Sequence, residues 1–107
     1  MKKDIEAILE FQLKALGIEF ERQVVIAEGQ ENKYKFDFFI SPCWLIECNG
    51  STWVPSRGHT SGNGIERDYR KAIQAAMHGY HLLPFTTEMI ENGEAVEYIC
   101  KLLKIAY

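Results

Sequence analysis

The first part of the chain alternates between helix-like and strand-like hydrophobic patterns. Apolar residues recur at helical spacing over residues 4–16, and Gly17 is a plausible stop, so a helix is expected there. Residues 19–26 and 33–40 predict two strands joined by a polar turn. Alternation in the second strand predicts two faces, one with Tyr34, Phe36, Phe38 and Ile40 and the other with Lys33, Lys35 and Asp37.

The middle of the chain predicts a third strand and a long loop. The Ser41-Pro42 pair ends the second strand, and the apolar stretch 44–50 predicts the next one. Residues 50–64 are rich in glycine, serine and threonine and show no periodicity. Loops of this length in compact domains are usually functional or mobile.

The last part predicts a helix at about 65–78 and a short strand over 80–85, whose Pro84 suits a strand end or a sheet edge. A helical turn from Thr87 and a final helix after Gly93 follow. The helix at 65–78 has an apolar stripe, expected to face the core, and an opposite polar face. The stripe comprises Tyr69, Ala72, Ile73, Ala76 and Met77, and the polar face comprises Arg67, Arg70, Lys71, Gln74 and His78.

The element order α-β-β-β-α-β-α, without a repeat or linker, predicts a single α/β domain over residues 1–107, with a mixed sheet flanked by helices. Hydrophobic residues make up 47% of the chain, enough for one core. No apolar run approaches the roughly 20 residues of a membrane span, and the start MKKDIEAIL does not resemble a signal peptide. The three cysteines lie in apolar runs and favour reduced thiols in a cytoplasmic protein.

Two acids lie within otherwise apolar predicted strands, Asp37 in one and Glu47 in the next. Carboxylates on buried strand faces are costly unless they bind a cation or a partner. Mg²⁺ prefers hard oxygen ligands, commonly one or two carboxylates completed by water and phosphate oxygens. Strand periodicity places Glu47 and Asn49 on one face and brings the backbone carbonyl of Cys48 near the same point. The pattern therefore predicts a site for Mg²⁺ or Mn²⁺.

The formal net charge of −3 at pH 7 argues, taken alone, against a nucleic-acid partner. The charges are unevenly distributed, however. Acids concentrate at both ends of the chain, whereas the stretch from Arg57 to Lys71 carries Arg57, Arg67, Arg70 and Lys71 against Glu66 and Asp68. Clustered carboxylates for a metal ion also cancel basic residues elsewhere, so the net charge does not exclude a nuclease.

Phe36-Asp37 followed by Leu45-Ile46-Glu47-Cys48-Asn49-Gly50 resembles the PD-(D/E)XK nuclease superfamily. Phe20-x-Arg22-Gln23, together with an acid on the first helix, Glu6 or Glu10, is similar to its very-short-patch-repair-like branch. Further residues resemble small phage endonuclease-like proteins: Gly50 to Trp53, Arg57 to Thr60, Gly62, Gly64, Glu66, Asp68, Lys71, Gly79-Tyr80, Phe85-Thr86, Met89 and Gly93 to Ala95. The resemblance thus covers nearly the whole chain.

The resemblance implies a restriction-endonuclease-like core that hydrolyses DNA phosphodiester bonds with Mg²⁺ or Mn²⁺. A structure-selective or nonspecific endonuclease in phage or bacterial DNA processing, repair or recombination is expected. Asp37 and Glu47 would bind the metal, with Glu6 as an outer ligand. The superfamily's lysine position is Asn49 here, and Lys71 is the candidate replacement. Pro84 stands where related sequences tend to carry a basic residue.

The remaining candidate residues would hold DNA through phosphate contacts, which position a substrate without reading its sequence. They are Trp53, Arg57, His59, Arg67 and Arg70. Trp53 is suited either to stacking on a base or to capping the core from the loop. Cys43, Cys48 and His59 fit no standard four-ligand zinc pattern.

Plainer interpretations stay open for several of these residues. Asp37 can be a surface acid paired with Lys33 or Lys35, Asn49-Gly50 a hairpin turn, Lys71 a partner of Asp68, Glu6 a helix surface acid, and the Arg67–Arg70 face a solvated one. The alternative functions are a nuclease-fold module that binds DNA without cutting and a subunit of a larger assembly. A homodimer is compatible with either.

Overall fold

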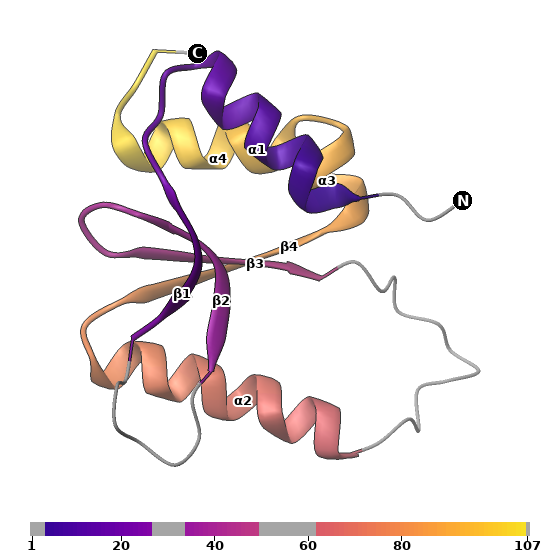
Figure 1. Cartoon of the computed structure of the whole chain (residues 1–107), viewed down its shortest axis with the longest axis vertical. Helices are drawn as coiled ribbons and strands as arrows, with labels where there is room; N and C mark the ends of the chain where they lie inside the picture. Colours follow the sequence, from indigo (N-terminus) through magenta and orange to yellow (C-terminus); the bar gives the residue numbers. More distant parts are fainter. Residues whose placement is uncertain (1–3, 27–33, 50–61, 107) are drawn as a thin grey trace.

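The computed structural model describes residues 4–26, 34–49 and 62–106, with the side chains of 62–65 left aside. Its elements in chain order are α1 (Ile5–Ala15), β1 (Glu21–Val25), β2 (Lys35–Ile40), β3 (Trp44–Asn49), α2 (Gly62–Met77), β4 (His81–Thr86), α3 (Thr87–Glu91) and α4 (Glu94–Leu103). Figure 1 shows three layers, with α1, α3 and α4 on one face of the sheet and α2 on the other. The predicted α/β class is confirmed.

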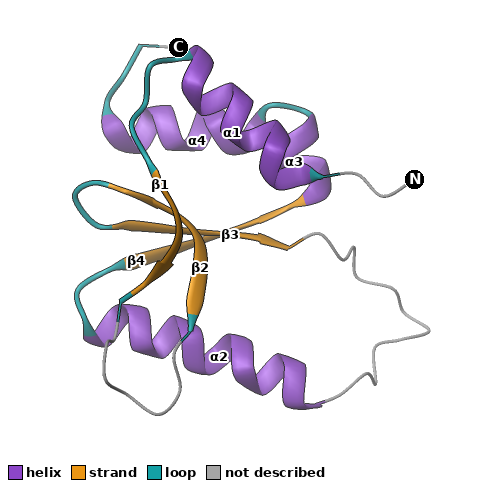
Figure 2. Ribbon diagram, in the orientation of Figure 1, coloured by secondary structure: helices purple, strands orange, loops and turns teal. Residues whose placement is uncertain are grey.

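The sheet has the strand order β1-β2-β3-β4 and is mixed (Figure 2). The strand β2 pairs antiparallel with both β1 and β3. The strand β3 pairs parallel with β4, and the helix α2 connects these two strands in the sequence. Parallel neighbours need a crossover connection, so Asn49-Gly50 does not turn a hairpin into the next strand. Pro84 lies on β4, which is an edge strand, as its missing N–H predicted.

The strand ends and helix starts follow local chemistry. The Asp4 side chain accepts a hydrogen bond from the Ala7 N–H and caps the start of α1. Gly17 follows the end of α1 with a φ of 72°, as the predicted stop requires. The structure corrects two bounds: β1 covers less than the predicted 19–26, and α2 begins at Gly62 rather than at 65. None of the described helices is long and apolar enough to cross a membrane.

Two hydrophobic clusters fill the spaces between the layers. The larger one joins the sheet to α1, α3 and α4 and includes Leu9, Leu13, Phe38, Ile46, Ile90 and Ile99. The smaller one joins the sheet to α2 and is built on Phe36, Leu45 and Ala75. Phe36 and Phe38 therefore lie in different clusters, although simple alternation put them on one face. The expected alternation of β2 is wrong at this point, and the residue between them is Asp37.

The helix α2 packs on the sheet through a face opposite to the one expected. Ala75 is fully buried, whereas Tyr69, Ile73 and Met77 of the predicted core stripe are 64%, 58% and 76% exposed. Lys71, assigned to the solvated face, is directed at the sheet, where its Nζ meets Glu47. The expected orientation of the helix is therefore wrong, because periodicity alone does not reveal which of its side chains find partners on the sheet.

Substitutions at two positions of α2 test this rotation. Ile73→Gln is expected to change the free energy of unfolding by less than about 0.5 kcal/mol, because its side chain is in solvent. Ala75→Gln is expected to lower the free energy of unfolding by about 1–3 kcal/mol or more, because the larger polar side chain overpacks the smaller cluster. Urea unfolding of the two variants measures both values. Equal destabilisation by the two substitutions would contradict the observed rotation.

Candidate functional site

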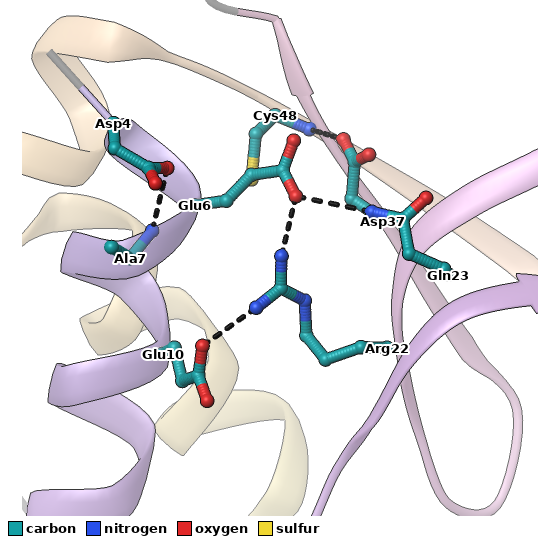
Figure 3. A network of polar contacts seen from close by, with 8 residues as sticks. All are labelled: Asp4, Glu6, Ala7, Glu10, Arg22, Gln23, Asp37 and Cys48. Carbon is teal, nitrogen blue, oxygen red and sulfur yellow. Dashed lines mark hydrogen bonds and ion pairs between the residues drawn. The ribbon is translucent and has the colours of Figure 1, made fainter.

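The candidate site lies where β2 and β3 part. The ladder between them runs through the pairs Ile40–Trp44, Phe39–Leu45 and Phe38–Ile46. One step further, the backbone N–H of Cys48 donates to Oδ2 of Asp37 at 2.7 Å, so a carboxylate takes the place of a backbone acceptor (Figure 3).

The bond between the Cys48 N–H and the Asp37 carboxylate shows which way the backbone of β3 faces in the gap, the place where the pairing of β2 with β3 ends. The N–H and C=O of one strand residue point to the same neighbouring strand. The Cys48 carbonyl is therefore directed at β2 as well, toward the strand that carries Asp37.

Glu47 lies on the side of the sheet that faces α2. Its Oε1 lies 2.9 Å from Nζ of Lys71, and only 17% and 12% of the two side chains are exposed. The same Nζ donates to the backbone carbonyl of Lys35 at 2.8 Å and lies 4.9 Å from the centre of the Phe36 ring. Lys71 thus pairs with Glu47 rather than with Asp68. The contact brings the candidate lysine to the candidate metal ligand.

The electrostatics of Glu47 reflect this crowding. Burial raises the pKa of the Glu47 carboxyl above its ordinary value, and the charge of Asp37 adds to the increase. The hydrogen bond and charge of Lys71, and a hydrogen bond from the Asp37 backbone, act in the opposite direction. A partly buried carboxyl whose pKa is raised, with the negative charge of Asp37 close by, forms a place where a bound cation is favourable.

A pocket of about 170 Å³ opens beside this pair. Its lining comprises Glu47, Asn49, Asp68, Lys71, Ala72, Leu82 and Pro84. Three residues predicted for catalysis, Glu47, Asn49 and Lys71, therefore share one cavity. From the sequence, Asp68 was expected at most to pair with Lys71, and only the placement of α2 over the sheet brings it to the pocket. Pro84 is the partner of Glu47 in the parallel β3–β4 register.

Glu6 approaches from the opposite side of the sheet, on α1. Its Oε1 accepts hydrogen bonds from Arg22 at 2.6 Å and from Gln23 at 3.2 Å, while Arg22 also binds Glu10 at 2.6 Å. Figure 3 shows the Glu6 carboxylate lying between Arg22 and the Asp37–Cys48 contact. Glu6 is thus hydrogen-bonded to two residues of β1, and it is not simply an acid on the helix surface.

Three carboxylates influence the pKa of the Cys48 thiol. Burial raises its pKa to about 12, and the charges of Asp37, Glu6 and Glu47 act in the same direction. The thiol is therefore protonated at neutral pH and offers no thiolate ligand. The three cysteines are free, as expected. The candidate ligand at this residue remains its backbone carbonyl.

The residues predicted to hold DNA are only partly placed. Arg67 and Arg70 are exposed on α2, and Arg70 forms a surface ion pair with Glu66 at 2.8 Å. Such exposed pairs contribute little, about 0–1 kcal/mol, so Arg70 is free to exchange this partner. Trp53, Arg57 and His59 lie outside the described residues.

The ligand atoms that the site offers determine which divalent cation it suits. Within the described residues, no group of three or more His, Cys, Asp or Glu side chains is arranged to hold a metal ion. Mg²⁺ requires less, since it usually keeps several waters and binds one or two carboxylates. Asp37, Glu47 and the Cys48 carbonyl offer hard oxygen atoms only, which suits Mg²⁺ or Mn²⁺ better than zinc.

Comparison with known proteins finds a solved structure with a similar fold. No family model matches the chain, and no curated protein does. Among solved structures, the chain is similar to the "Homing Endonuclease I-Bth0305I Catalytic Domain". The two folds are alike. The TM-score is 0.66, the sequence identity is 18%, and the match covers 92% of this chain and 91% of that domain. At this identity the likeness establishes a shared fold and leaves the activity to the chemistry of the site.

Proposed function

We propose that the chain is a metal-dependent nuclease domain of the PD-(D/E)XK type that hydrolyses DNA phosphodiester bonds. One observation carries the proposal: the Asp37 carboxylate binds the backbone N–H of Cys48, the neighbour of Glu47 in β3, and Lys71 of α2 is ion-paired to Glu47. The fold shared with a homing endonuclease catalytic domain supports the same assignment.

Each residue has a defined task in this proposal. Asp37, Glu47 and the Cys48 carbonyl would hold Mg²⁺ or Mn²⁺, with Glu6 acting at the outer edge. A bound cation of this kind lowers the pKa of water and neutralises charge that develops at phosphorus. Lys71 supplies the positive charge that Asn49 lacks, because its ammonium group lies at the rim of the pocket beside Glu47. Asn49 is exposed at that rim and offers an amide donor.

The substrate would approach from the side of α2. Arg67 and Arg70 are exposed on the helix that carries the pocket residues Asp68 and Lys71. Guanidinium groups at these positions suit phosphate contacts, which hold a duplex without selecting its sequence. We extend the proposal to Trp53, Arg57 and His59 from the sequence alone. Structure-selective or nonspecific endonuclease activity in phage or bacterial DNA processing, repair or recombination follows.

A second candidate function is DNA binding without cleavage, alone or within a larger assembly. Two features favour it. Asn49 stands at the superfamily's lysine position, and the neutral Pro84 is the register partner of Glu47. The exposed stripe of Tyr69, Ile73 and Met77 on α2 also leaves an apolar surface for a second protein or a second copy.

A cleavage assay separates the candidates. Supercoiled plasmid, single-stranded DNA and branched DNA are incubated with the protein and Mg²⁺, Mn²⁺ or EDTA. The proposed nuclease cuts at least one substrate with metal and none with EDTA. Gel-shift binding of the same DNAs without cutting in either metal would replace it with the binding module. Neither binding nor cutting, together with a dimer by light scattering, would favour a subunit role.

A further inference from the structure

One guanidinium group holds two acids of α1. Arg22 donates to Oε1 of Glu6 through one terminal nitrogen and to Oε1 of Glu10 through the other, both at 2.6 Å. The two acids are equally exposed, at 31% and 30%, and lie one helical turn apart. The Arg22 guanidinium also lies 4.5 Å from the centre of the buried Phe38 ring, which fixes its position against the sheet.

The two acids differ in their other neighbours. Glu10 faces outward to a second cation, Lys14, at 3.1 Å, and the Lys14 side chain is 67% exposed. Glu6 instead shares its bound oxygen with a second donor, the Gln23 amide, and its carboxylate lies beside the Asp37–Cys48 contact (Figure 3). Glu10 is therefore paired with an exposed lysine at the protein surface, whereas Glu6 is held near Asp37, where the pairing of β2 with β3 ends (Figure 3).

Gln23 adds an independent observation. It lies within β1 with a φ of 52°, a left-handed conformation that residues other than glycine and asparagine adopt at a cost. The register places Arg22 opposite Phe38 and Val24 opposite Phe36, so Gln23 lies across from Asp37. Backbone strain of this kind is retained where the surroundings require it and gathers at functional sites. Here it accompanies the contact of the Gln23 amide with Glu6.

We propose that Arg22 and Gln23 are positioning residues that hold the Glu6 carboxylate beside Asp37 and Cys48, and that Glu10 serves only to anchor Arg22. The role rests on the proposed nuclease function. Both contacts use Oε1 of Glu6, and within the described part of the chain Oε2 accepts no hydrogen bond. In the proposal, that oxygen is the one available to act at the outer edge of the metal site. The assignment also selects Glu6 over Glu10 as the functional acid of α1.

The matched acids give a direct test. Glu6→Gln and Glu10→Gln each remove one charge from the same guanidinium, so a purely structural network predicts equal effects. The positioning role predicts different ones. Glu10→Gln should keep the Kd for Mn²⁺ and the kcat within about twofold of wild type. Glu6→Gln should weaken Mn²⁺ binding and lower kcat by about 10–100-fold, with KM for DNA unchanged, as for other outer-shell partners.

Two further variants connect the effect to the proposed residues. Gln23→Ala removes a contact of Glu6 and leaves both ion pairs of Arg22, so it should reproduce part of the Glu6→Gln loss while folding normally. Arg22→Gln combined with Glu6→Gln should be no worse in kcat than Glu6→Gln alone, since Arg22 acts through Glu6. Calorimetric Mn²⁺ titration and steady-state cleavage measure these values, and urea unfolding in EDTA confirms that the variants are folded.

The outcomes are distinguishable. Equal losses in Glu6→Gln and Glu10→Gln, in a wild type that binds Mn²⁺ and cuts DNA, would overturn the positioning role and leave the nuclease proposal standing. A wild type that neither binds Mn²⁺ nor cuts any DNA would overturn both. Loss confined to Glu6→Gln, Gln23→Ala and the Arg22 variants would establish the role.

Discussion

Asp37→Asn is expected to abolish metal-dependent cleavage and to leave the protein folded. The amide oxygen of asparagine can still accept the hydrogen bond that the Cys48 N–H donates at 2.7 Å, so the gap between β2 and β3 keeps its geometry. The negative charge that would attract the divalent cation is lost. Outer-shell partners of metal sites already contribute about 10–100-fold to activity, so a direct ligand is expected to contribute more than about 100-fold.

Stability in EDTA separates this effect from a structural one. Without a metal ion, Asp37→Asn removes a charge that raises the pKa of Glu47, so the variant should be at least as stable as wild type. Asp37→Ala leaves the Cys48 N–H without its acceptor and should cost about 1–3 kcal/mol. Urea unfolding and plasmid cleavage of the two variants provide the comparison. Retained cleavage by a folded Asp37→Asn protein would remove Asp37 from the metal site.

The sequence predicted that Asp37 and Glu47 lie on neighbouring strands because the signals for this arrangement are local. Asp37 and Glu47 stand out within apolar strands, and a short connection makes those strands neighbours. The strand period then predicted that Glu47 and Asn49 share a face, and both line the same pocket. The parallel pairing of β3 with β4 followed from the intervening helix, because such a pair needs a crossover.

The orientation of α2 was not predictable from its period. Its stripe of Tyr69, Ile73 and Met77 has the spacing of a core face, yet these residues are exposed. Hydrophobic spacing ranks the faces of a helix by transfer free energy alone. The face that packs on the sheet instead carries Ala75 and the ion pair of Lys71 with Glu47 of a distant strand, which no local pattern records. The same contact explains why Lys71 was identified as a candidate only through a family resemblance.

The network on α1 was equally hidden from the sequence. The sequence favoured Glu6 over Glu10 as the outer ligand, but the two acids lie one turn apart and their spacing does not reveal their partners. Their difference arises from β1, where Gln23 adopts a left-handed conformation and reaches only Glu6. Positive φ at a glutamine within a strand has no compositional signal. Long-range partners therefore decide which of two similar acids belongs to the site.

Lys71→Met is expected to cause the largest loss of stability among the site variants. Methionine keeps an apolar stem over Phe36 but leaves the Glu47 carboxylate without its cation. Removing one partner of a buried pair costs about 3–5 kcal/mol. Because the side chains retain 12% and 17% exposure, we expect about 2–3 kcal/mol at pH 7. Adding Glu47→Gln should restore most of this loss, since the double variant buries no unpaired charge.

The pH dependence of Lys71→Met identifies Glu47 as the cause. Burial already raises the folded-state pKa of Glu47 above its unfolded value, and Lys71 partly offsets that increase. Without Lys71 the folded-state pKa rises further, so the folded protein binds the Glu47 proton more tightly than the unfolded chain does. Stability relative to wild type should therefore be nearly retained below the unfolded pKa and fall as the pH rises through the folded one.

Urea unfolding of wild type, Lys71→Met and the double variant in EDTA, from pH 4 to pH 8, measures this dependence. The deficit of Lys71→Met should grow with pH, whereas the deficit of the double variant should not grow, because its glutamine does not titrate. A deficit that is independent of pH in Lys71→Met would show that lost packing over Phe36, rather than an unpaired carboxylate, destabilises the variant. Glu47 would then have no need of a positive partner, and the electrostatic case for a cation at this carboxylate would fail with it.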